Sequence, residues 1–236
     1  MKLINIPNII TCCNLISGCI ATYWAFQSRC DLALLFIVIG AVFDFFDGMT
    51  ARLLHVSSPI GKELDSLADV VTFGVAPSAI VFQYLVSQPF HEFPVYAATA
   101  MPFVAFVMAG FSALRLAKFN LDERQAMGFI GLPTPANALF WGALIVGGGK
   151  WLESNTYFPY GIILLLLISC YLLISEIPMF ALKFKHWGWK GNGVKYVFVL
   201  TSAVLLLLFR VNGIAMVIAW YVLLSVITNL IQKKTT

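Results

Sequence analysis

Charged side chains are scarce in this sequence. Asp, Glu, Lys and Arg together make up 11% of its 236 residues, whereas 60% of the residues are hydrophobic. A soluble domain carries about a quarter charged residues, so the composition excludes an ordinary soluble protein. Because the apolar residues also come in long blocks, we expect an all-α fold, a polytopic bundle of transmembrane helices.

Cysteine and histidine are few, and they lack the spacing of a zinc site. The five cysteines fall mostly within apolar runs and are interpreted as small buried apolar residues. The three histidines fall in predicted loops at no shared spacing, which indicates a surface role. These residues are Cys12, Cys13, Cys19, Cys30 and Cys170, and His55, His91 and His186.

The hydropathy of the chain predicts eight membrane spans. They run from about 9 to 27, 32 to 54, 63 to 87, 95 to 118, 134 to 150, 157 to 175, 194 to 209 and 212 to 231. Asn212-Gly213 is expected to form the turn between the last two spans, and Gly147 to Gly149 weaken the end of the fifth. These spans leave no room for a second folded domain, so we expect residues 1–236 to form one integral membrane domain.

The basic residues predict the orientation of these spans. An even number of spans places both termini on one side, and that side then holds 12 of the 15 Lys and Arg residues. Arg29, Lys150 and Arg210 fall on the other side. This asymmetry follows the positive-inside rule. We therefore expect both termini, and the loop between the second and third spans, to face the cytoplasm from the cell inner membrane.

Four carboxylates flank that loop in an otherwise apolar chain. On helices, the first two are three residues apart and the last two are four apart, so each pair shares a face. Residues 55–62 contain the turn chemistry of a loop, and the next helix is expected to begin near Glu63. Two antiparallel helices with a short loop can bring the two faces together. The four acids are Asp44, Asp47, Asp65 and Asp69.

Such a cluster is costly unless cations neutralise it. Each acid at the bilayer centre costs about 2.5–3.5 kcal/mol on insertion scales, and the single Arg52 cannot balance four of them. Oxygen-only clusters suit Mg²⁺, Mn²⁺ or Ca²⁺. Four carboxylates can hold two such ions about 4 Å apart, an arrangement used for displacement at phosphorus. The alternative interpretation is a set of ordinary interfacial charges near helix ends.

The pattern Asp44-x2-Asp47-Gly48-x2-Ala51-Arg52-x8-Gly61-x3-Asp65-x3-Asp69 resembles the signature of the CDP-alcohol phosphatidyltransferase family. The resemblance implies a core of six transmembrane helices, a homodimer, and a site that opens to the cytoplasm. It also implies that an alcohol displaces CMP from a CDP-linked lipid.

The same resemblance implies roles for individual residues. The four Asp residues would hold two divalent cations, Mg²⁺ or Mn²⁺, and Asp69 would also be the general base for the incoming hydroxyl. Small and polar residues would bind the CDP-lipid. These are Asn8, Thr11, Gly48, Ala51, Arg52, Gly61 and Lys62.

Further segments resemble the serine-specific branch of the family, which implies CDP-diacylglycerol and L-serine as substrates. They are IPNIITCCN at 6–14, TFGVAP at 72–77, LRLAKFN at 114–120 and GLPTPANA at 131–138. A serine carboxylate needs a cationic partner, and the forked guanidinium of Arg115 is a candidate. Lys118 is a second candidate, and Asn120 could orient the ligand. The alternative is that both cations merely snorkel to the membrane surface.

Two other functions stay open. The first keeps the chemistry but uses glycerol 3-phosphate or inositol phosphate, acceptors that should demand more basic side chains. The second is a cation or proton transporter, because intramembrane acids also mark ion pathways. A transporter usually carries broken helices or repeats near the midplane, whereas these acids flank one loop. The partners expected are the two substrates and membrane lipid, with no nucleic acid.

Overall fold

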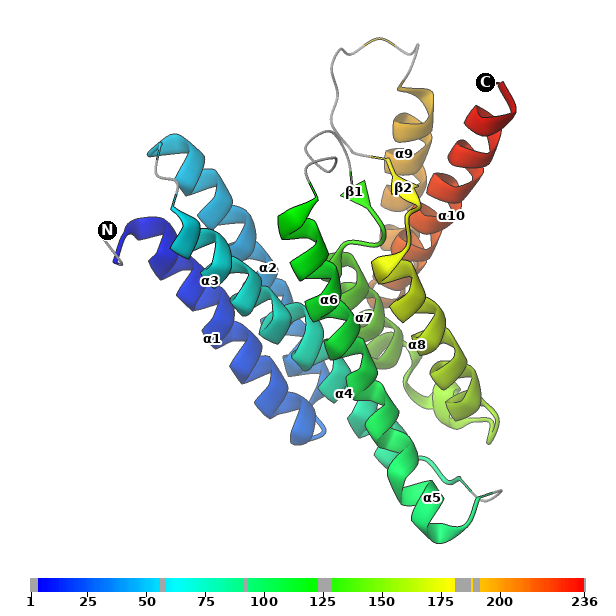
Figure 1. Cartoon of the computed structure of the whole chain (residues 1–236). Coiled ribbons are helices and arrows are strands. Elements are labelled where there is room, and N and C mark those ends of the chain that lie inside the picture. The colour runs from blue at the N-terminus through cyan, green and yellow to red at the C-terminus, as the bar shows by residue number, and fades with distance from the viewer. Residues whose placement is uncertain are drawn as a thin grey trace.

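The computed structural model describes residues 4–55, 58–90, 93–122, 129–180, 188 and 192–235, and it forms a bundle of helices (Figure 1). The helices are α1 (Ile6–Phe26), α2 (Cys30–Leu53), α3 (Pro59–Asp69), the π-helix η1 (Val70–Val75), α4 (Ala76–Val86), α5 (Val95–Ala100), the 3₁₀-helix η2 (Met101–Phe106), α6 (Val107–Leu121), α7 (Thr134–Glu153), α8 (Phe158–Ile174), α9 (Gly193–Phe209) and α10 (Val211–Thr235). Two short strands, β1 (Phe129–Ile130) and β2 (Pro178–Met179), pair antiparallel.

The helices form eight segments that correspond to the eight predicted spans. One segment, Pro59–Val86, joins α3, η1 and α4, and another, Val95–Leu121, joins α5, η2 and α6. Five segments of the described chain are long and apolar enough to cross a membrane, and Phe158–Ile174 and Gly193–Phe209 are shorter apolar helices. The prediction of an all-α, polytopic membrane bundle is confirmed.

The start of α3 differs from the prediction. The helix begins at Pro59 rather than near Glu63. Ser58 caps it, because the Gly61 backbone N–H donates to Ser58 Oγ at 3.0 Å, and Pro59 suits the first helical position. Gly61 and Lys62 therefore lie on the first turn of a helix that faces α1, and not in a loop.

The turn between α9 and α10 was also misplaced. The chain reverses at Arg210, whose φ is +49°, while Asn212 and Gly213 already belong to α10. Gly213 is required for packing instead, because a Cβ atom there would lie 2.6 Å from the Leu205 carbonyl oxygen. The glycine thus allows close contact between the two helices rather than a tight turn.

The glycine run in α7 interrupts that helix as expected. Gly149 has φ +40° and ψ −129°, a conformation that kinks α7 and favours glycine. At Gly147 a Cβ atom would lie 2.0 Å from Asn212 Oδ1, so this glycine lets α10 approach α7.

The burial predicted for the cysteines is mostly wrong. Cys170 is buried, but Cys12 and Cys19 are exposed, and Cys13 and Cys30 are half-buried. The exposed pair lies on α1, a helix of an apolar bundle, where outward positions are as apolar as the core. His55 is exposed at the end of α2, whereas His91 and His186 lie outside the described residues.

The core of the bundle is centred on α4. Ala76, Ile80 and Leu85 are fully buried, and they join Phe73 of η1 and Trp141 of α7 in one apolar cluster. Both chain termini lie at the same end of the bundle, as an even number of segments requires (Figure 1). The end of α2 and the start of α3 lie at that end too, beside the first turns of α1. This arrangement brings the acidic stretch against α1.

Candidate active site

The last turns of α2 and the middle of α3 bring three acidic side chains together. One carboxylate oxygen each of Asp44, Asp47 and Asp65 lies within 4.8 Å of the other two. Asp47 is buried and the other two are half-buried. One oxygen of Asp65, Oδ1, is buried without a hydrogen-bond partner among the described residues. An oxygen-only group of this kind could hold a hard divalent cation.

Asp69, the fourth predicted acid, lies one turn deeper on α3. It is buried, and it is close enough to Asp44 and Asp65 for their charges to repel its own. Its Oδ1 accepts a hydrogen bond of 3.1 Å from Asn14 Nδ2 on α1. Asp69 is therefore held at the inner side of the cluster rather than within the group of three.

Asn14 is a site residue that was not predicted from the sequence. Its side chain is fully buried, and its Oδ1 has no hydrogen-bond partner in the described part of the chain. A signal was available in the sequence, because Asn8, Thr11 and Asn14 recur at intervals of three in an apolar helix. Residues three apart share a helix face, so α1 presents one polar stripe to the acids of α2 and α3.

The π-helix η1 begins immediately after Asp69 and fixes its position. Thr72 Oγ1 donates to the backbone oxygen of Asn14 at 3.0 Å. A Cβ atom at Gly18 would lie 2.4 Å from Thr72 Oγ1, and one at Gly40 would lie 2.5 Å from Thr72 Cγ2. Thr72 thus fits between two glycines of α1 and α2. Single π-turns occur often at functional sites, and this one anchors the deep end of α3.

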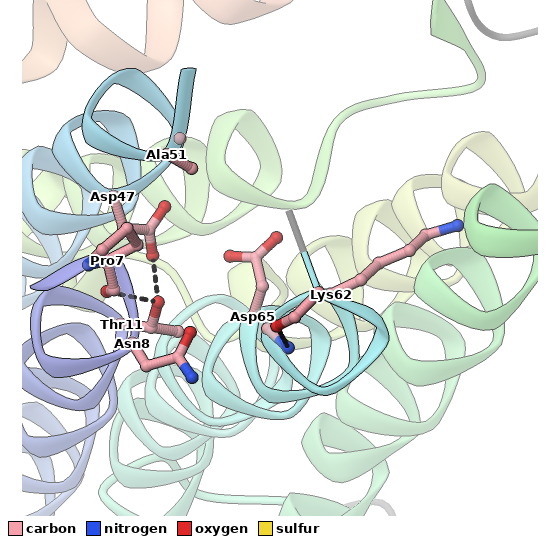
Figure 2. Close-up of a pocket in the computed structure, with 10 residues that line it drawn as sticks. Pro7, Asn8, Thr11, Asp47, Ala51, Lys62 and Asp65 are labelled. Carbon is pink, nitrogen blue, oxygen red and sulfur yellow. Dashed lines mark hydrogen bonds between the residues drawn. The ribbon is translucent and has the colours of Figure 1, made fainter. Parts of the chain in front are cut away.

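A pocket of about 310 Å³ opens beside the acids, between α1, α2 and α3 (Figure 2). Thr11 Oγ1 donates to Asp47 Oδ2 across it at 2.6 Å. Six of the seven residues predicted to bind the CDP-lipid line this pocket, whereas Arg52 does not and is exposed at the end of α2. The lining residues are Pro7, Asn8, Thr11, Asp47, Gly48, Ala51, Ser58, Gly61, Lys62 and Asp65.

The two glycines of the pocket serve different purposes. A Cβ atom at Gly48 would meet no described atom within 4 Å, so this glycine leaves open space beside the carboxylates. At Gly61 a Cβ atom would lie 3.1 Å from Asn8 Oδ1, so this glycine allows α3 to approach α1. Lys62 extends away from Asp65 (Figure 2), and its Nζ donates to the backbone oxygen of Asn120 at 2.8 Å.

Arg115 lies on α6 and is nine-tenths buried, with 6% of its surface exposed. Its Nη1 donates to Thr134 Oγ1 at 3.4 Å, and its guanidinium lies 5.1 Å from the centre of the Phe119 ring. The charge of Asp69 attracts it. Its Nε is buried without a partner among the described residues, so Arg115 keeps a free donor for an anionic group.

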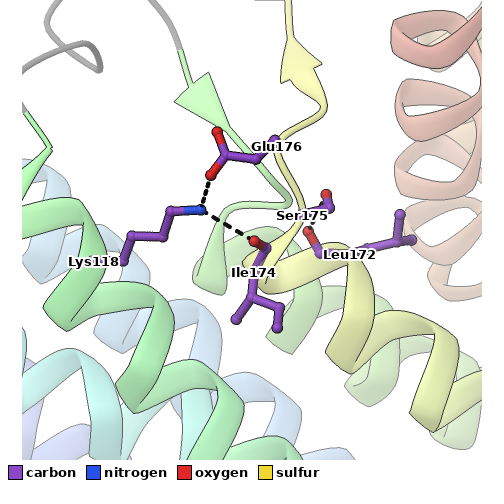
Figure 3. Close-up of polar contacts among 5 residues, drawn as sticks. All are labelled: Lys118, Leu172, Ile174, Ser175 and Glu176. Carbon is purple, nitrogen blue, oxygen red and sulfur yellow. Dashed lines mark hydrogen bonds and ion pairs between the residues drawn. The ribbon is translucent and has the colours of Figure 1, made fainter.

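Lys118 and Asn120 make contacts within the protein. Lys118 forms an ion pair with Glu176 and donates to the backbone oxygen of Ile174 at 3.2 Å (Figure 3). Asn120 Nδ2 donates to Ser66 Oγ of α3 at 2.8 Å. Arg115 differs from these two residues because its Nε donor is buried and unpaired within the described part of the chain.

Together these features favour chemistry on a phosphate ester. The clustered acids offer cation ligands, the pocket offers polar and small walls, and Asp69 offers a buried carboxylate with one oxygen hydrogen-bonded to Asn14. The arrangement suits in-line displacement at phosphorus, where cations held by the acids would neutralise phosphate charge and a carboxylate would accept a proton.

Comparison with known proteins agrees with this chemistry. The family model for CDP-alcohol phosphatidyltransferase matches residues 4–189, which include all of α1 to α8. The chain is 38% identical to a CDP-diacylglycerol–serine O-phosphatidyltransferase of Bacillus subtilis over 189 residues, which cover 77% of this chain and 90% of the relative. Proteins of the same name from Helicobacter pylori strain J99 (33% over 189 residues, 78% and 75%) and Methanocaldococcus jannaschii (35% over 176 residues, 75% and 74%) are also similar. This chain belongs to the CDP-alcohol phosphatidyltransferase family.

Proposed function

We propose that this protein is a phosphatidylserine synthase of phospholipid biosynthesis. It transfers the phosphatidyl group of CDP-diacylglycerol to the hydroxyl of L-serine and releases CMP. The observation that carries the proposal is the pocket of about 310 Å³ that adjoins three clustered carboxylates. The names of the three relatives, which cover three quarters or more of this chain at 33–38% identity, support serine as the acceptor.

The four acids would hold two divalent cations, Mg²⁺ or Mn²⁺. Their donor atoms are all carboxylate oxygens, the ligands that these ions prefer, and the unpaired Oδ1 of Asp65 offers a free position. When bound, the cations would neutralise charge on the pyrophosphate and on the departing CMP. Thr11 would hold Asp47 in place through its hydrogen bond of 2.6 Å.

Asp69 would act as the general base. As the serine oxygen forms its bond to the phosphorus that carries diacylglycerol, the bond from that phosphorus to the CMP oxygen breaks, and the hydroxyl proton passes to Asp69. Asn14 occupies Oδ1 of this carboxylate, which directs Oδ2 to the hydroxyl. The acidity of the hydroxyl rises during attack, so a carboxylate suffices as the base.

The substrates would bind on opposite sides of the acids. The pocket residues of α1, α2 and α3 would take the cytidine and pyrophosphate, and Arg52, exposed at the end of α2, would contact a phosphate. Arg115 would bind the serine carboxylate through its free Nε, with Lys118 and Asn120 nearby on α6. Among the described residues, Arg115 is the one buried basic side chain. One such side chain suits a carboxylate better than a phosphate, which favours serine over glycerol 3-phosphate or inositol phosphate.

The protein would lie in the cell inner membrane with both termini and the site facing the cytoplasm. Both termini and the acidic stretch share one end of the bundle (Figure 1), and the predicted topology places 12 of the 15 Lys and Arg residues there. The whole chain would act as one domain, because α10 packs on α7 and α2 through Ala215, Ala143 and Leu34. A homodimer and the absence of nucleic-acid partners complete the proposal.

An assay of CMP release tests this function. Purified protein receives CDP-diacylglycerol with Mg²⁺ or Mn²⁺, and serine, glycerol 3-phosphate and inositol phosphate are offered separately. We expect CMP release with serine, and none when the metal is chelated. Release with glycerol 3-phosphate but not with serine would overturn the choice of acceptor. Ion flux in liposomes without any CMP release would favour a transporter instead.

A further inference from the structure

A short segment after α8 links the acceptor side of the site to the last helix of the chain. We call residues 174–180 the strap. On one side, Lys118 of α6 donates to the backbone oxygen of Ile174 and pairs with Glu176 (Figure 3). Lys118 lies one turn from Arg115 on the same helix. The strap thus holds the end of α6, the helix that carries Arg115, which is the residue proposed to bind serine.

The strap also holds the residues that lead into α7. The Gly131 backbone N–H donates to the Ile177 oxygen at 2.9 Å, and β1 pairs with β2. Gly131 has φ +75°, and a Cβ atom there would lie 2.7 Å from the Leu173 oxygen, so only glycine fits this close approach. Three residues later, Thr134 accepts the hydrogen bond of Arg115. The strap therefore contacts both the end of α6 that carries Arg115 and the segment that leads to Thr134, the hydrogen-bond partner of Arg115.

The far side of the strap is held by α10. Tyr221 Oη donates to the Phe180 backbone oxygen at 3.0 Å, and Asn229 Nδ2 donates to the Pro178 oxygen at 2.6 Å. The Tyr221 ring contacts the Phe180 ring, with 4.8 Å between their centres, and the Phe198 ring of α9 contacts both. In Figure 1, β2 lies beside α10. The family match ends at residue 189, before α9 and α10 begin.

We propose that the α9–α10 hairpin positions the acceptor side of the active site through the strap, with Tyr221 and Asn229 as positioning residues for serine binding. This inference rests on the proposed function, because it takes serine as the ligand of Arg115. The two α10 side chains fix the strap, the strap fixes Lys118 and β1, and these fix Arg115 and Thr134. The CDP-lipid pocket lies between α1, α2 and α3. Lys62 of this pocket donates to the Asn120 backbone oxygen at the end of α6, but none of the hydrogen bonds of the strap named above reaches a pocket residue directly.

The test is the double variant Tyr221→Phe and Asn229→Leu, which keeps the bulk of both side chains and removes both hydrogen bonds to the strap. We expect the KM for serine to rise about tenfold, given what two hydrogen bonds contribute, while the KM for CDP-diacylglycerol stays within about twofold. Glu176→Gln, which loses the ion pair with Lys118, should change the same constant in the same direction.

A control variant within the hairpin separates positioning from general stability. Trp220→Phe removes the hydrogen bond of 2.9 Å from Trp220 Nε1 to Thr201 Oγ1, which joins α9 to α10 without touching the strap. It should leave the KM for serine unchanged. An unchanged KM for serine in the double variant, or an equal rise in both KM values, would overturn the inference.

Hydrogen exchange gives a readout that does not need activity. The backbone amides of Gly131 and Leu132 donate to the oxygens of Ile177 and Leu172. In the double variant their exchange should quicken, while exchange in α1 to α3 stays unchanged. Unchanged exchange at these two amides would refute the strap as a link. Quicker exchange in a protein that releases no CMP with serine would instead refute the proposed function alone.

Discussion

Asn14 offers the sharpest test of how the site is built, because a single hydrogen bond joins it to the proposed base. Asn14→Leu keeps the branched shape of the side chain, at a larger volume, and removes the donor to Asp69 Oδ1. A hydrogen bond to a charged group contributes about 1.5–3 kcal/mol. If that energy holds Asp69 in its reactive position, its loss lowers kcat roughly 10- to 100-fold, at about 1.4 kcal/mol per factor of ten.

Stability should change much less than turnover. Asn14 Oδ1 is buried without a partner among the described residues, so replacing the amide by an apolar group also removes an unsatisfied acceptor. The exchange also leaves the buried Asp69 Oδ1 without its donor, which costs about 1–3 kcal/mol, and removal of the unsatisfied acceptor offsets part of that loss. The KM for CDP-diacylglycerol should also change little, because Asn14 does not line the nucleotide pocket. The expected signature is a low kcat in a protein that still folds, with a modestly lower melting temperature.

Initial rates of CMP release at saturating serine and metal measure this effect. Ser17→Ala is the matched control, since Ser17 lies one turn further along α1 and its hydroxyl donates only to the Cys13 backbone oxygen of the same helix. The control should keep the wild-type kcat. A kcat for Asn14→Leu within twofold of wild type would refute the positioning of Asp69 by Asn14.

Three further predictions test the cluster and its packing. Asp69→Asn should abolish CMP release while binding of CDP-diacylglycerol stays measurable by titration; near-normal turnover would exclude Asp69 as the base. Asp47→Asn should raise the Mn²⁺ concentration needed for half-maximal activity, and an unchanged requirement would remove Asp47 from the ligand set. Gly18→Ala should lower the unfolding free energy by about 1–3 kcal/mol and reduce the melting temperature, because its Cβ atom would meet Thr72 side-chain and backbone atoms at 2.4–2.8 Å. Gly110→Ala, where a Cβ atom meets no described atom within 4 Å, should leave stability unchanged or slightly higher, and equal losses in both variants would contradict the packing argument.

Much of the fold could be predicted because a helix that spans a membrane requires a long run of apolar residues. Long apolar runs marked each helical segment, and every predicted boundary falls within about four residues of the observed one. Errors occurred where local chemistry decided the boundary. Helix α3 begins earlier than predicted because Ser58 caps it and Pro59 suits its first position. The chain reverses at Arg210, a residue with positive φ that turn propensities do not predict.

The acidic cluster was predictable because its spacing fixes helix faces. Residues three or four apart share a face, so Asp44 and Asp47 had to point the same way, and one short loop had to bring Asp65 near them. The same geometry indicates why Arg52 lies outside the pocket. At about 100° per residue, five steps place it roughly 140° around the helix from Asp47. A contact between Arg52 and substrate stays a prediction.

Contacts between distant segments could not be predicted from spacing. The hydrogen bond from Asn14 to Asp69 joins residues 55 positions apart, and the bond from Asn229 to Pro178 joins residues 51 apart. Such pairs depend on how whole helices pack, which glycines such as Gly18 decide through close approach. The spacing of polar residues within one helix does not show which other helix will pack against it.

The most direct test of the metal-dependent chemistry is to locate the ion itself. Crystals or particles of the purified protein with Mn²⁺ and CDP-diacylglycerol allow manganese to be identified by anomalous scattering or by density at the site. We predict Mn²⁺ in contact with carboxylate oxygens of Asp44, Asp47 and Asp65, next to the pyrophosphate. Liponucleotide density in the pocket of an active protein, with these three side chains free of metal, would contradict the proposal.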